Sequence, residues 1–192
     1  RDLLVIGLGN PGDRYTNTRH NVGVDALEVL AARCGERLTP DKKSSAMLAE
    51  LRLGSCRAVG AFPTTWMKES GRAVAALVRR DEIDDGARLV VLHDELDLPP
   101  GRIKVKLGGG LAGHNGLRSL TQHLHTQDYV RIRIGVGRPP GGPGRGADWV
   151  LSKVGKADRV ELDIACQLAA DAVEVVASAG VDAAMAAFNQ SG

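Results

Sequence analysis

The sequence lacks the features that mark several large classes of protein. It has three cysteines among 192 residues, and Cys34, Cys56 and Cys166 lie far apart, which fits reduced thiols and no clustered zinc site. The longest apolar run near the start covers residues 3–9, well short of the roughly 18 to 20 residues of a membrane-spanning helix. The run also lacks the length and cleavage pattern of a secretory signal, so we expect a cytoplasmic protein.

A strong excess of charge of one sign is missing as well. The formal net charge is +2, which is too weak for a general nucleic-acid binder. There is no internal repeat and no linker, and 43% of the residues are apolar and 25% charged. This length and composition predict one compact domain over residues 1–192.

The charge is nevertheless distributed unevenly. Residues 101–146 hold eight basic residues and one acidic residue, a net charge of +7, which leaves −5 for the rest of the chain. The same segment holds 12 of the 24 glycines. Two interpretations stay open: a surface that binds a polyanion such as phosphate, or a solvated charged face between ordinary turns.

Apolar runs alternate with helical periodicity, which predicts an α/β sandwich: a twisted mixed β-sheet flanked by helices. The expected strands cover residues 3–8, 47–53, 56–62, 88–92, 103–107 and 130–134. The expected helices cover residues 22–34, 70–80, 117–125, 157–179 and 183–188, and residues 138–146 are expected to form a loop. The strands 103–107 and 130–134 alternate apolar with basic residues, so each should place two cations on one face of a half-covered strand.

The segment 7–12 satisfies the G-x-G-x-x-G pattern directly after a strand, which raises the possibility of a dinucleotide site. Its context argues against that site, because the polar loop 13–21 delays the helix whose N-terminus would hold the pyrophosphate. What remains is a tight turn that exposes Asn10 at the carboxyl end of a strand, where α/β sheets place their ligands.

Two residues are candidates for acid–base chemistry. His20 lies in the polar loop, and Asp94 follows directly after a buried strand at the same kind of sheet edge. A neutral imidazole that bonds a carboxylate through one nitrogen can deprotonate water with the other. No serine or cysteine stands in a nucleophile motif, and no metal-ligand spacing is present, so we expect water as the nucleophile and neither a metal nor a cofactor.

The glycine-rich loop 108–116 ends where a helix begins. Its backbone N–H groups could bind an anion or allow a bulky ligand to approach closely, or the loop could be a flexible hairpin tip. Both interpretations stay open.

Taken together, six motifs resemble the bacterial peptidyl-tRNA hydrolase family. They are G-L-G-N-P-G (7–12), Y-x-x-T-R-H-N (15–21), P-T-T-W-M-K-E-S-G (63–71), H-D-E-L-D-L-P-P-G (93–101), K-L-G-G-G-x-x-G-H-N-G-L-R-S (106–119) and R-I-R-I-G-V-G-R-P (131–139). The resemblance implies a monomeric enzyme that hydrolyses the ester between a peptide and the 3′ end of tRNA, without a cofactor.

The same resemblance implies roles for individual residues. His20 resembles the catalytic base and Asp94 the carboxylate that orients it. Lys106 and Arg133 resemble the pair that binds the 5′ phosphate of tRNA. Contact with the substrate is implied for Asn10, Tyr15, Asn21, Met67, Lys68 and Asn115.

Among the departures from the family pattern, one concerns a residue implied to contact the substrate. Lys68 stands where the family motif M-N-x-S-G has asparagine, and a lysine cannot accept a hydrogen bond as an amide does. We therefore predict weaker turnover of ordinary peptidyl-tRNA, or an altered preference for the acyl group. Two alternatives stay open: a paralogue specialised for another acylated tRNA, and a tRNA-binding protein without catalysis.

Overall fold

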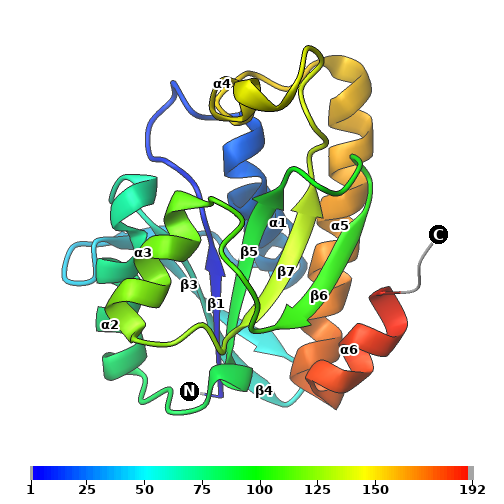
Figure 1. Ribbon diagram of the computed structural model, residues 1–192. Coiled ribbons are helices and arrows are strands. Elements are labelled where there is room, and N and C mark those ends of the chain that lie inside the picture. The colour runs from blue at the N-terminus through cyan, green and yellow to red at the C-terminus, as the bar shows by residue number, and fades with distance from the viewer. Residues whose placement is uncertain (1, 190–192) are drawn as a thin grey trace.

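Seven strands form one mixed sheet in the computed structural model, which describes residues 2–189 (Figure 1). The strands are β1 (Leu3–Gly7), β2 (Thr39–Asp41), β3 (Ala46–Leu53), β4 (Cys56–Pro63), β5 (Leu89–Glu95), β6 (Ile103–Leu107) and β7 (Val130–Gly135). Their order is β2-β3-β4-β1-β5-β7-β6, in which β4, β1, β5 and β7 run parallel while the pairs β2–β3, β3–β4 and β6–β7 are antiparallel. The predicted mixed sheet is confirmed.

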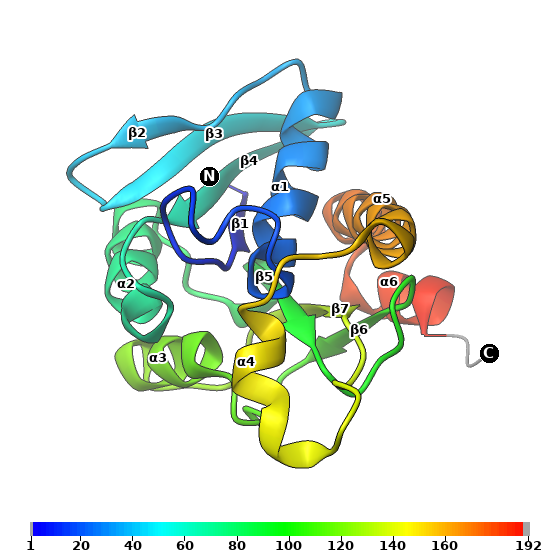
Figure 2. The same cartoon turned by 90° about the horizontal axis from the view of Figure 1, so that it is seen from above.

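Helices cover both faces of this sheet (Figure 2). They are α1 (Val22–Arg33), α2 (Ser70–Arg80), α3 (Asn115–Leu124), α4 (Gly146–Val150), α5 (Lys156–Ala179) and α6 (Val181–Phe188). The helices α1, α5 and α6 lie on one face and α2 and α3 on the other, while α4 lies above the carboxyl ends of the parallel strands. The predicted α/β sandwich is therefore confirmed. Within residues 2–189, no helix is both long and apolar enough to cross a membrane.

The sheet buries a separate apolar cluster on each face, because successive strand residues point to opposite sides. Leu3 and Val5 belong to the cluster with α1, α5 and α6, whereas Leu4 and Ile6 belong to the cluster with α2 and α3. All four side chains are buried. The continuous apolar run of β1 follows from this double burial.

Close packing fixes the loop that precedes α1. A Cβ atom on Gly23 would lie 2.2 Å from the backbone oxygen of Leu92, so α1 can approach β5 this closely only with glycine at that position. The loop 10–21, which carries His20, is thereby held at the carboxyl edge of the sheet.

Most predicted elements match the structure, and the differences have local causes. The strand β5 does not end at residue 92, because its pairing with β7 continues to Glu95, so Asp94 lies within the strand and not after it. The helix α3 begins at Asn115 and not at 117, because the His114 side chain caps its first turn. Two short elements, β2 and α4, were not predicted.

Candidate active site

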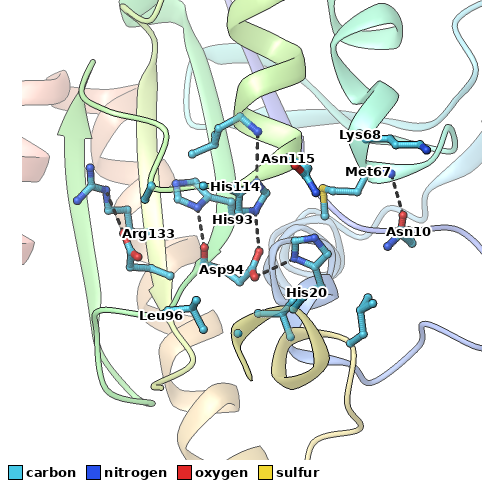
Figure 3. A pocket seen from close by; sticks show the side chains of 18 of the residues that line it. Asn10, His20, Met67, Lys68, His93, Asp94, Leu96, His114, Asn115 and Arg133 are labelled. Atoms are coloured by element: carbon cyan, nitrogen blue, oxygen red, sulfur yellow. Dashed lines mark hydrogen bonds and ion pairs between the residues drawn. The ribbon is translucent and has the colours of Figure 1, made fainter. Parts of the chain in front are cut away.

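A cavity of about 640 Å³ opens at the carboxyl ends of the parallel strands, beside α4 (Figure 3). It brings together most of the side chains predicted to form a site. Among its lining residues are Asn10, Tyr15, His20, Met67, Lys68, Asp94, His114, Asn115 and Arg133. Asn21 and Lys106 are not among them.

Asp94 is the centre of a buried hydrogen-bond network. Its Oδ2 atom accepts a hydrogen bond from Nδ1 of His20 at 2.9 Å, and its Oδ1 atom accepts one from Nε2 of His114 at 2.8 Å. The Asp94 side chain is 3% exposed. Burial alone would raise the pKa of Asp94, but the charges and hydrogen bonds of the two histidines outweigh it and hold that pKa well below its ordinary value. Asp94 is therefore an ionised carboxylate at neutral pH.

The network leaves one nitrogen of His20 available for chemistry. Because the Asp94 carboxylate accepts the proton on Nδ1, neutral His20 carries a lone pair on Nε2. Burial of the ring is the largest single influence and opposes its protonation, but the charge of Asp94 and its hydrogen bond together outweigh burial and raise the pKa of His20 above its ordinary value. This arrangement suits a general base whose proton is returned later in the reaction.

His114 is a site residue for which the sequence reasoning found no role. Its Nδ1 atom accepts hydrogen bonds from the backbone N–H groups of Gly116, at 3.1 Å, and Leu117, at 3.2 Å, so the ring proton sits on Nε2 and points at Asp94. The N–H group of Gly116 is therefore not available to bind an anion, and anion binding by the rest of the loop 108–116 stays a prediction. The signal in the sequence was the glycine-rich loop itself, which turns the chain so that His114 reaches Asp94.

His93 is buried directly behind the network. Its Nδ1 atom donates a hydrogen bond to the backbone oxygen of Asp94 at 2.9 Å. Burial, together with the neighbouring His114, lowers the pKa of His93 to about 3. His93 therefore stays neutral and adds no positive charge next to Asp94.

Asn10 is held by hydrogen bonds at the side of the cavity where Met67 lies. Its Oδ1 atom accepts a hydrogen bond from the backbone N–H of Met67 at 2.7 Å. Its own backbone N–H and oxygen pair with the side-chain amide of Asn21, each at 2.9 Å. Asn21 is thus a buried brace for Asn10 in the structure, and direct contact of Asn21 with substrate stays a prediction.

Comparison with known proteins places this arrangement in a family. The family model described as "Peptidyl-tRNA hydrolase" matches residues 4–192. The peptidyl-tRNA hydrolase of Rhodococcus erythropolis is 50% identical over 181 residues, covering 94% of each chain, and that of Cutibacterium acnes is 47% identical over 97% of each. The crystal structure of peptidyl-tRNA hydrolase from Acinetobacter baumannii superposes with a TM-score of 0.91 at 35% identity, covering 97% of this chain and 94% of that one.

The chain belongs to the peptidyl-tRNA hydrolase family. It is an enzyme that hydrolyses the ester bond of peptidyl-tRNA, and peptidyl-tRNA is its substrate. The resemblance noted in the sequence is thereby confirmed.

The basic strands of this hydrolase divide into different roles. Lys104 pairs with Arg133 and Lys106 with Arg131, and cross-strand partners share a face, so the prediction that Lys106 and Arg133 point to one face is confirmed. Arg133 lines the cavity with its side chain 20% exposed and its Nε atom 3.7 Å from Glu95, while Lys106 is exposed beyond it.

The expectation that the 130–134 strand shows two cations on a half-covered face is wrong for Arg131, which is fully buried. The glycine-rich loop folds over this part of the strand, and the Arg131 guanidinium donates hydrogen bonds to the backbone oxygens of Gly110 and Gln127. Arg131 therefore braces the loop that carries His114, and its charge is not part of a surface for phosphate.

The hydrolase also has three side chains that could surround a cation. Ligand atoms of His20, Asp94 and His114 lie within 4.8 Å of one another. Nδ1 of His20 and Nε2 of His114 each lie at hydrogen-bond distance from Asp94. The other ring nitrogen of His114 accepts a hydrogen bond from the backbone N–H of Gly116. These contacts fit a carboxylate that orients His20 more closely than a metal-ligand set, because the ligand atoms are already bonded to one another.

Proposed function

We propose that the hydrolase uses His20 as the general base and Asp94 as its orienting carboxylate, without a metal ion. The Nε2 atom of neutral His20 removes a proton from water as the water oxygen attacks the ester carbonyl carbon. The tetrahedral intermediate then breaks its bond to the ribose oxygen at the 3′ end of tRNA. That oxygen takes the proton back from the His20 imidazolium, which restores the base and releases peptide and tRNA.

The observation that carries this proposal is the 2.9 Å contact between Nδ1 of His20 and Oδ2 of Asp94, which favours the tautomer with the proton on Nδ1. Asp94 is itself held by His114, so its carboxylate cannot rotate away from His20 without losing a buried hydrogen bond. A charged, buried acceptor also favours the imidazolium that forms during the reaction. His114 acts here as a positioning residue.

Polar groups around His20 are suited to hold the ester and stabilise the negative charge on its oxygen. Because Oδ1 of Asn10 accepts the Met67 N–H, the Asn10 amide nitrogen is left to donate into the cavity. Asn115 is exposed at the first position of α3 and lines the same cavity. Met67 and Tyr15 supply apolar contact for the peptide.

The nucleic acid is assigned to the Arg133 side of the cavity. Arg133 and Lys106 share one sheet face, and Arg133 is the one that reaches the cavity wall, so a 5′ phosphate between them would lie at a distance from the ester. Such a contact recognises the acceptor end of tRNA without touching the reacting bond. The monomeric state and cytoplasmic location stay predictions.

One assay tests the proposed chemistry. The protein is incubated in EDTA with N-acetylated and with free aminoacyl-tRNA, alongside His20→Ala. We expect release of the acetylated species only, unaffected by EDTA, and a loss of about 10²- to 10⁴-fold in His20→Ala. Loss of turnover in EDTA, or full activity of His20→Ala, would contradict the proposal.

A further inference from the structure

Lys68 carries a positive charge in the cavity wall that no neighbouring negative charge balances. The other charged groups in the wall lie in pairs, because Asp94 contacts two histidines and Glu95 lies 3.7 Å from Arg133. The Lys68 side chain is exposed and makes no hydrogen bond or ion pair with any residue in the described range 2–189. A lone cation in a largely apolar wall favours an anionic group on the ligand.

The backbone that carries Lys68 is anchored, although its side chain is flexible. Lys68 follows Met67, whose N–H is bound by Oδ1 of Asn10 at 2.7 Å and whose backbone oxygen accepts from Ser70 Oγ at 2.7 Å. The four-carbon stem of lysine can then follow an anion over several positions from a fixed origin. The cation therefore stays within reach of the rim of the cavity and can adapt to substrates of different length.

Lys68 lies on the peptide side of the ester. Figure 3 shows Lys68, Met67 and Asn10 at one side of the cavity and Arg133 at the other, with His20 and Asp94 between them. If the tRNA occupies the Arg133 side, as proposed above, the peptide of the bound substrate extends from the ester toward Lys68.

A second hollow adjoins the cavity at Trp66, close to Lys68 in sequence. Trp66 is 51% exposed and borders both this cavity and the second hollow, which Thr65 and Arg72 also line. The residue that precedes the esterified one would thus pass between Trp66 and Lys68.

We propose that Lys68 makes the enzyme prefer peptidyl-tRNAs whose peptide carries a carboxylate side chain on the residue before the esterified one. This inference rests on the proposed orientation of the substrate in the cavity. Exposed ion pairs are weak, so we expect about a two- to fivefold preference in kcat/KM over the neutral isostere.

The experiment uses three substrates with the same tRNA and the same esterified alanine. The preceding N-acetylated residue is glutamate, glutamine or lysine. We expect the wild-type protein to hydrolyse the glutamate substrate fastest and the lysine substrate slowest. Lys68→Asn should bring the three rates together, Lys68→Glu should reverse their order, and the wild-type preference should shrink as salt screens the pair. The control Lys43→Asn removes an exposed lysine outside the cavity and should keep the wild-type order.

Two results would overturn this inference while the proposed chemistry stands. Equal rates for the three substrates in the wild-type protein would mean that Lys68 does not contact the side chain of the preceding residue. An equal loss on all three substrates in Lys68→Asn would mean that Lys68 contacts a group that they share, such as a tRNA phosphate or the peptide backbone. Failure of the chemistry is separate, because it would show as retained activity in His20→Ala.

Discussion

Two walls of the active-site cavity are built in different ways. The sheet-edge wall, made of Asn10, Asp94 and His114, is held by hydrogen bonds of 2.7 to 3.2 Å to side chains and backbone. The α4 wall, residues 146–151, faces the cavity with glycine and apolar side chains. Proton transfer needs fixed distances, whereas apolar contacts tolerate peptides of many sequences. In the proposed mechanism, the hydrogen-bonded wall performs the chemistry and the apolar wall adds no competing polar contacts.

Arg19 joins these two walls. It precedes His20 in sequence, is 4% exposed, and stacks its guanidinium 3.4 Å from the ring centroid of Trp149 in α4. It also donates hydrogen bonds to Ser152 Oγ at 2.6 Å and to Asp158 at 3.0 Å. The α4 wall is therefore attached to the backbone segment that carries His20.

The largest effect is expected from a substitution that disrupts the hydrogen bonds of the sheet-edge wall. In Asp94→Asn the amide can donate to His20 and favour the wrong tautomer, and the stabilising charge is lost, so we expect kcat to fall by about 10²- to 10⁴-fold. The measurement is hydrolysis of N-acetylaminoacyl-tRNA, with circular dichroism to confirm folding. Activity within tenfold of wild type in a folded variant would show that the chemistry does not depend on the hydrogen bonds of the sheet-edge wall.

A smaller effect is expected where the walls are joined. Arg19→Lys keeps the charge but loses the planar stack on Trp149 and the paired hydrogen bonds, so His20 should be less well positioned. We expect kcat to fall by about tenfold with little change in KM. The matched control is Arg33→Lys, because Arg33 also links α1 to α5 through hydrogen bonds to Asp171 and Glu174 but lies outside the cavity.

An equal loss of kcat in the Arg19→Lys and Arg33→Lys variants would mean that Arg19 has only a structural role. A rise of KM in Arg19→Lys with kcat unchanged would place its effect in substrate binding and remove the link to the base.

The smallest effect on chemistry is expected outside both walls. Lys106→Gln and Arg133→Gln should raise KM several-fold and leave kcat close to wild type, because a phosphate contact acts at a distance from the ester. Each change should also lower the slope of log affinity against log salt by about 1. A salt response that matches wild type, measured by tRNA binding, would remove the phosphate role of that residue.

Periodicity was enough to predict the elements that position the site, and contacts distant in sequence were needed for the rest. The run of β1 and the helix 70–80 follow from local apolar spacing. The three-residue strand β2 forms through pairing with β3, which its own sequence does not signal. The role of His114 depends on a loop that folds it against Asp94, and the burial of Arg131 depends on the same loop.

The candidate residues show the same division. His20 and Asp94 could be paired in advance because His20 lies in the loop that follows β1, Asp94 lies near the end of β5, and these two parallel strands end at one sheet edge. Asn21 could not be separated from a substrate-binding residue by sequence, since its bonds to Asn10 require the folded turn.

The pH dependence of kcat/KM tests most directly whether Asp94 tunes His20 as a base. Since the base must be neutral and its pKa is raised by Asp94, the acid limb of the wild-type profile should have its midpoint above pH 6.5. In Asp94→Asn the raising charge is gone while burial remains, so the midpoint should move to lower pH. A midpoint that is the same in both proteins, or a wild-type profile with no acid limb, would contradict the assignment of His20 and Asp94.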